Sequence, residues 1–283
     1  MNEAPSTKSP YVRVGVYIFF YAVTVIFSTS PLTGLGGDFL GITLSAFLAA
    51  WLANFLALRI YEHHSLATIG LGMQAPALRH FALGVAGGFG AAVLVVAIGF
   101  ASGMARAEPA AGHDVTPGSF AFVTILLLAG ATGEELFFRG YGFQVLVRTW
   151  GPFATILPAG VVFGLLHASN PNATYLGIAN TVGFGILFGY AFLRSGDLWF
   201  PIGLHFGWNF ALPLFGLNVS GFTMRLTGYA VRWSAGEIWS GGAYGPEGSL
   251  LTTFALSALL LYLRRAPLQQ QPLAPLDEAV KGD

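Results

Sequence analysis

The sequence has no cysteine, and only 9% of its 283 residues are charged. The missing cysteines exclude disulfides, thiol nucleophiles and cysteine-ligated metals. Soluble domains carry roughly 25% charged residues, so the low charge excludes an ordinary soluble domain. The 13 basic residues balance the 13 acidic ones, and this zero net charge gives no sign of nucleic-acid binding.

Hydrophobic residues make up 54% of the chain, and they gather in long uncharged runs. Such runs are typical of helices that cross a bilayer. The sequence therefore predicts an all-α polytopic membrane protein with about eight transmembrane helices. The expected spans are Val14–Phe27, Phe39–Leu58, Phe81–Phe100, Ser119–Val147, Phe153–Ala168, Tyr175–Leu193, Leu198–Leu217 and Leu250–Leu263.

The spans form a single membrane domain over residues 11–265. A polar, proline-containing lead (1–10) precedes it and a Pro- and Gln-rich tail (266–283) follows it, and both are expected to be disordered. The long segment Asn218–Ser249 carries Trp233 and Trp239, so we expect a loop at the membrane interface rather than a lid.

The basic residues predict the orientation of the chain. With eight spans, nine of them share the side of the two termini: Lys8, Arg13, Arg59, Arg79, Arg148, Arg194, Arg264, Arg265 and Lys281. The other side has Arg106, Arg225 and Arg232, and Arg139 lies within a span. An excess of basic residues marks the cytoplasmic side, so both termini are expected there. In a bacterial host this is a multi-pass protein of the inner membrane.

Three charges interrupt the fourth span, in the stretch Glu134-Glu135-Leu136-Phe137-Phe138-Arg139. Charged groups inside a membrane are costly, so they are usually paired or functional. Glu135 and Arg139 are four residues apart and can pair on one face of a helix. Glu134 is rotated by about 100° from Glu135, which leaves it free for chemistry. We therefore expect Glu135 and Arg139 to support a reactive Glu134.

Two later spans also carry polar groups. His167 ends the fifth, and His205 and Asn209 share one helix face in the seventh. Each of these residues alone could be a packing residue hydrogen-bonded between helices. Together with Glu134 they suggest a site built from three spans.

Two kinds of chemistry fit these residues. In one, Glu134 and His167 activate a water molecule, and His205 and Asn209 stabilise the oxyanion of a peptide or amide hydrolysis. In the other, Glu134, His167 and His205 bind a zinc ion that activates the water. The usual His-Glu-x-x-His zinc motif is absent. Spacing alone does not decide between the two.

The ordered motifs Glu134-Glu135-x-x-x-Arg139, Phe163-x-x-x-His167 and His205-x-x-x-Asn209 resemble those of the CAAX-protease and bacteriocin-processing family of intramembrane endopeptidases, also called the Abi family. The resemblance covers roughly 119–217. It implies a helical membrane fold with an intramembrane cavity and a hydrolase activity with the residue roles given above. The family includes the endopeptidase of prenylated CAAX proteins and is commonly labelled metalloprotease. We keep zinc as a possible cofactor and prefer the mechanism that requires none.

The resemblance implies that the partners are the lipid bilayer and a membrane-embedded or lipid-anchored peptide substrate. Two other functions stay open. One is a catalytically silent scaffold or immunity-type protein with the same fold. The other is a proton-coupled transporter that uses Glu134 and His167 as a relay. A transporter would favour internal repeats, and the sequence has none that we detect.

Overall fold

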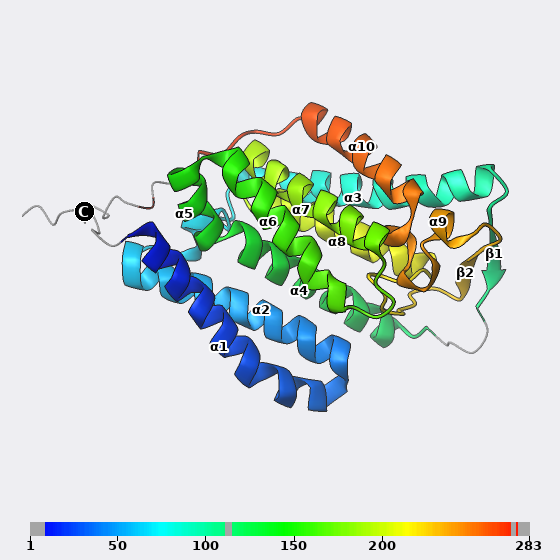
Figure 1. Ribbon diagram of the computed structural model, residues 1–283, viewed down its shortest axis with the longest axis horizontal. Helices are drawn as coiled ribbons and strands as arrows, with labels where there is room; N and C mark the ends of the chain where they lie inside the picture. The colour runs from blue at the N-terminus through cyan, green and yellow to red at the C-terminus, as the bar shows by residue number, and fades with distance from the viewer. Residues whose placement is uncertain (1–8, 111–114, 273–275, 277–283) are drawn as a thin grey trace, which may run out of the picture.

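The computed structural model describes residues 9–110, 115–272 and 276, and the chain is mostly helical, as predicted. Figure 1 shows the long helices running side by side, with a two-stranded sheet at one end of the bundle. The α-helices are α1 (Pro10–Gly36), α2 (Asp38–Ala57), α3 (Ala75–Ala101), α4 (Pro117–Arg139), α5 (Tyr141–Trp150), α6 (Pro152–Leu166), α7 (Tyr175–Ser195), α8 (Trp199–Leu214), α9 (Glu237–Ser240) and α10 (Leu250–Arg265). The short helical turns are η1 (Leu58–Glu62), η2 (Leu66–Ile69), η3 (His167–Ser169), η4 (Gly242–Tyr244) and η5 (Pro246–Gly248).

Six helical segments among the described residues are long and apolar enough to cross a membrane. They are Pro10–Gly36, Asp38–Glu62, Ala75–Ala101, Pro117–Trp150, Pro152–Ser169 and Tyr175–Ser195. The other two predicted spans are α8 and α10, which have 16 residues each. A helix of 16 residues is about 24 Å long, which is less than the hydrocarbon core of about 30 Å. The structure confirms the helical membrane fold, and the count of eight is approximate.

The predicted fourth span, Ser119–Val147, is interrupted at Gly140, where the backbone leaves the helical conformation (φ −73°, ψ −148°). Asn54 on α2 explains the break. Its Oδ1 accepts a hydrogen bond of 2.7 Å from the backbone N–H of Tyr141. A Cβ at Gly140 would lie 2.3 Å from that oxygen, so only glycine fits there. The contact comes from another helix, and the local sequence therefore does not reveal it.

Helices α3 and α8 pack closely against each other through glycines. A Cβ added at Gly88 would lie 1.9 Å from the backbone oxygen of Leu204, and one at Gly84 would lie 2.4 Å from that of Phe200. Small residues allow such an approach in membranes. This packing holds α8 at the centre of the fold, where Phe200 to Trp208 are all buried.

We expect Gly88→Ala to destabilise the protein by about 1–3 kcal/mol, because the added methyl group forces α3 and α8 apart. Gly90→Ala is the matched control on the same helix, since an added Cβ there meets nothing within 4 Å. It should be neutral or stabilising by about 0.5–1 kcal/mol. Unfolding of both variants in detergent measures the difference, and equal stabilities would contradict this account of the packing.

The two-stranded sheet was not predicted. Strands β1 (Ala105–Pro109) and β2 (Tyr229–Trp233) are antiparallel, with Ala107 opposite Val231. They come from two segments between the expected spans, Ser102–Gly118 and the predicted loop Asn218–Ser249. Each strand has only five residues, and the two strands are more than 100 residues apart in the chain. The local sequence therefore does not predict their pairing.

The tail is attached to the bundle over its first part. Gln271 donates a backbone hydrogen bond of 2.7 Å to the oxygen of Ser195, and the backbone N–H of Gln269 contacts Nε2 of His80 at 3.2 Å. Residues 266–272 are therefore held in place, although we expected the whole tail to be disordered. Most of the predicted lead and the remainder of the tail except Leu276 lie outside the described residues.

Candidate active site

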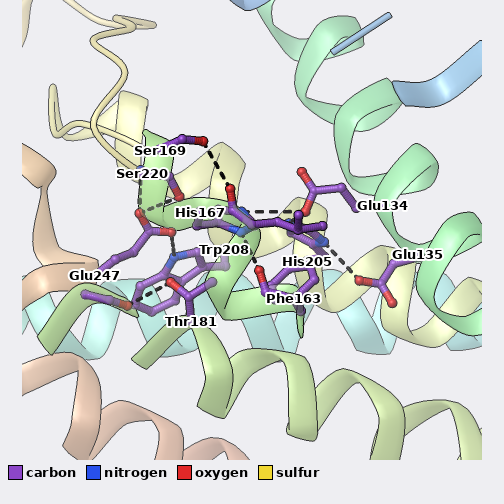
Figure 2. Close-up of polar contacts among 12 residues, drawn as sticks. Glu134, Glu135, Phe163, His167, Ser169, Thr181, His205, Trp208, Ser220 and Glu247 are labelled. Carbon is purple, nitrogen blue, oxygen red and sulfur yellow. Dashed lines mark hydrogen bonds and ion pairs between the residues drawn. The ribbon is translucent and has the colours of Figure 1, made fainter. Parts of the chain in front are cut away.

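Three helices bring the predicted residues together. Glu134 lies on α4, His167 begins η3 at the end of α6, and His205 lies on α8. Oε2 of Glu134 is 3.8 Å from Nε2 of His167 and 3.9 Å from Nε2 of His205. Both rings thus present Nε2 to the same carboxylate oxygen (Figure 2).

Glu135 and Arg139 pair as predicted. Nη1 of Arg139 donates to Oε1 of Glu135 at 3.1 Å, and both side chains are fully buried. Nη2 donates to the backbone oxygen of Gly185 at 2.5 Å, which ties α4 to α7. The guanidinium also lies 5.2 Å from the ring centre of Phe163, within the range of a cation–π interaction. The pair is therefore an internal brace behind Glu134.

The structure adds a contact that the sequence did not reveal. Oε1 of Glu135 also lies 3.0 Å from Nδ1 of His205. The same carboxylate thus contacts the arginine of its own helix and the histidine of α8. Spacing along α4 predicts the first contact, whereas the second depends on how the helices cross.

Hydrogen bonds assign the protons of the two imidazoles. Nδ1 of His167 lies 2.8 Å from the backbone oxygen of Phe163, which can only accept, so Nδ1 carries the proton. By the same argument, Nδ1 of His205 donates to the Glu135 carboxylate. In the neutral rings, both Nε2 atoms then have a lone pair directed at Glu134. His167 can accept a proton there, and His205 can donate from Nε2 only as an imidazolium.

Glu134 faces a cavity of about 230 Å³. Its Oε2 is buried without a hydrogen-bond partner, while 34% of the side chain is exposed. His167, His205 and Asn209 line the same cavity, so all four predicted reactive residues share one space. A buried acceptor without a partner is costly, and a bound water or substrate would satisfy it.

A carboxylate that we did not predict, Glu247 on η5, lies at the other side of the cavity. It accepts a hydrogen bond of 3.1 Å from Nε1 of Trp208 and another of 2.9 Å from the hydroxyl of Ser220. Figure 2 shows this group across the two histidines from Glu134. Burial raises the pKa of Glu247, and the hydrogen bonds from Ser220 oppose that rise. Its sequence context, a glycine-rich loop before the last helix, gives no sign of this position.

The long segment Asn218–Ser249 does more than lie at an interface, because Val219, Ser220 and Phe222 line the cavity. The ring of Phe222 lies 5.0 Å from that of Phe39 at the start of α2. This aromatic contact joins the segment to α2 across the cavity. The segment therefore forms a wall of the site.

The zinc alternative, with Glu134, His167 and His205 as ligands, stays a prediction. Within the described part of the chain, no three His, Cys, Asp or Glu side chains are grouped closely enough to hold a metal ion. Tetrahedral zinc with bonds of about 2.0 Å holds its ligand atoms about 3.3 Å apart. The separations of 3.8 and 3.9 Å from Glu134 are larger than that.

One family model matches the part of the chain that contains these helices. Residues 116–211 match the family model Rce1-like, described as type II CAAX prenyl endopeptidase. The match covers about a third of the chain and contains all four residues that the sequence predicts to be reactive, together with the Glu135–Arg139 pair. A search of curated proteins found no match.

Proposed function

Because this chain belongs to the CAAX protease family through its membrane core, we propose that it is an intramembrane endopeptidase with a membrane-associated or lipidated substrate. One observation carries the proposal. The carboxylate of Glu134 lies 3.8 and 3.9 Å from the Nε2 atoms of His167 and His205, and all three residues line one cavity between membrane helices. A carboxylate in that position is suited to take a proton from water.

In the proposed reaction, a water molecule lies between Glu134 and His167. Glu134 takes one proton as the water oxygen bonds to the carbonyl carbon of the scissile peptide. His167 holds the same water through Nε2 and orients it. The proton then passes to the peptide nitrogen, the C–N bond breaks, and Glu134 returns to its ionised form. The products are a carboxylic acid and an amine.

His205 and Asn209 are the proposed donors to the oxyanion. Because Nδ1 of His205 already donates to Glu135, its Nε2 carries a hydrogen only in the imidazolium form. The carboxylates of Glu135 at 3.0 Å and Glu134 at 3.9 Å stabilise that form. Glu135 thus has a proposed positioning role as well as its bond to Arg139.

We expect Asn209→Ala to lower kcat by about 10²–10³-fold, the usual effect of removing one oxyanion donor. KM should change little, because the lost hydrogen bond forms mainly in the transition state. Asn218→Ala is a control, since Asn218 does not line the cavity and its side chain donates to the backbone oxygen of Ala243. Equal kcat values for Asn209→Ala and wild type would remove Asn209 from the mechanism.

A cleavage assay on purified protein in detergent tests the proposed activity. A fluorogenic prenylated C-terminal peptide is a suitable probe, because peptide and enzyme meet in the micelle whatever the orientation of the chain. We expect wild type to cleave it and Glu134→Ala to leave it intact. If wild type cleaves no membrane peptide and a cellular phenotype survives Glu134→Ala, the protein is the silent scaffold instead.

A further inference from the structure

The part of the cavity wall formed by residues 219–222 is a tight turn. Val219 and Phe222 exchange two backbone hydrogen bonds of 2.9 Å, so Ser220 and Gly221 form a two-residue turn between them. Both central residues have a positive φ, 48° at Ser220 and 88° at Gly221. Such turns strongly prefer Asn-Gly, Asp-Gly or Gly-Gly. Serine at this φ is strained, and strain of this kind persists only where the surroundings hold it.

Glu247 supplies the contacts that hold Ser220 (Figure 2). Its Oε2 accepts hydrogen bonds from the backbone N–H and from the hydroxyl of Ser220, the latter at 2.9 Å. Its Oε1 accepts a hydrogen bond of 3.1 Å from the indole N–H of Trp208. Indole and backbone N–H groups can only donate, so both oxygens must accept. The position therefore requires a carboxylate, because a glutamine would place its NH₂ group against one of these two donors.

Trp208 connects Glu247 to the helix of the proposed oxyanion donors. It is buried on α8, next to Asn209 and three residues after His205. Glu247 is itself held against α7, because its backbone oxygen accepts a hydrogen bond of 2.8 Å from Nδ2 of Asn180. The bond from the indole to Glu247 therefore fixes α8 beside the oxyanion donors.

The turn connects Glu247 in the other direction, to the loop that begins at His167. An added Cβ at Gly221 would lie 1.9 Å from the backbone oxygen of Pro171, so the two segments touch there. The preceding residue, Asn170, lines the cavity and donates a backbone hydrogen bond of 3.1 Å to the oxygen of His167. A movement of the turn would therefore move the loop that begins at His167.

From these contacts we infer that Glu247 is a positioning residue of the proposed hydrolysis, whose carboxylate holds the strained turn and Trp208 where the reaction requires them. The inference rests on the proposed function. Both carboxylate oxygens are taken by donors of the protein, so Glu247 acts by holding other groups in place rather than by taking a proton itself. It lies outside residues 116–211, the part that matches the family model, so the C-terminal part of the chain contributes to the site.

Crosslinking tests the position of the turn independently of activity, because the chain has no cysteine of its own. Phe39→Cys and Phe222→Cys together place thiols at two rings whose centres are 5.0 Å apart. A short bifunctional thiol reagent should join them in purified protein in detergent. We expect the reaction to be several times slower when Glu247→Gln is added, because the turn then loses its hold. An unchanged rate would overturn the inference.

Ser220→Gly and Ser220→Ala are matched variants that test the strain. Both lose the hydroxyl bond to Glu247, but only glycine adopts a positive φ without cost. In the presence of Glu247→Gln, we expect Ser220→Gly to recover most of the lost crosslinking rate and Ser220→Ala to recover none. Equal rates for the two would overturn the inference. Made alone, they allow the same comparison if Glu247→Gln does not fold.

Cleavage of the fluorogenic prenylated peptide tests the effect on the reaction. We expect Glu247→Gln to lower kcat per folded protein by about 10–10²-fold, because small displacements of reacting groups are costly. Glu237→Gln, at an exposed carboxylate of the same segment, is the control and should leave kcat unchanged. A wild-type kcat for Glu247→Gln would make Glu247 a purely structural residue and overturn the inference. If wild type cleaves no peptide, the proposed function fails, while the crosslinking rates still decide whether Glu247 holds the turn.

Discussion

Replacement of Glu134 by glutamine lowers kcat by about 10²–10⁴-fold, the range that a general base contributes. Glutamine has the shape of the carboxylate, but its amide cannot take the proton of the attacking water. The change leaves the Glu135–Arg139 pair in place, so the variant should fold as wild type does. Initial rates at saturating substrate measure kcat, and unfolding in detergent checks the fold.

Glu108→Gln is a suitable control for the loss of a carboxylate. Glu108 lies on β1, pairs with Arg106 and is partly exposed, far from the cavity. Its replacement should leave kcat unchanged. If Glu134→Gln retained most of the wild-type rate, the carboxylate would not be the base and the proposed mechanism would be wrong.

Arg139→Met is the second change with a large expected effect, a loss of about 3–5 kcal/mol of stability. Both partners are fully buried, so removal of the guanidinium leaves the Glu135 charge facing only His205. It also removes the bond to the backbone of Gly185 that joins α4 to α7. Denaturant unfolding of the purified protein in detergent measures the loss.

A double variant separates charge from packing. Glu135→Gln combined with Arg139→Met removes both charges, so it should be less destabilising than Arg139→Met alone. Arg232→Met, at a side chain that is 60% exposed, is the control and should change stability little. If Arg139→Met lowers the free energy of unfolding no more than Arg232→Met does, the Glu135–Arg139 pair does not brace the fold.

The sequence was informative where chemistry depends on spacing within one helix. The interval between Glu135 and Arg139 predicted their bond, and charges within an apolar run singled out Glu134. Polar residues in otherwise apolar spans also led to His167, His205 and Asn209. In a membrane segment each such residue stands out, because the surrounding composition is uniformly apolar.

Contacts between distant segments could not be predicted in this way. The bond from His205 to Glu135 depends on the crossing of α4 and α8, and the break at Gly140 depends on Asn54 of α2. Glu247 lies in a glycine-rich segment whose path is set by tertiary contacts. These three features decide the tautomer of His205, the end of α4 and the far wall of the cavity.

Chelation tests the central claim most directly, namely that Glu134 and His167 activate the water without a metal ion. Cleavage of the prenylated peptide is measured for wild type and Glu134→Gln, each with and without a zinc chelator, followed by added zinc. Our account predicts a wild-type rate that the chelator leaves unchanged and a rate near zero for Glu134→Gln under every condition. A wild-type rate that is lost on chelation and restored by zinc would contradict it, and would assign His167 and His205 to metal binding.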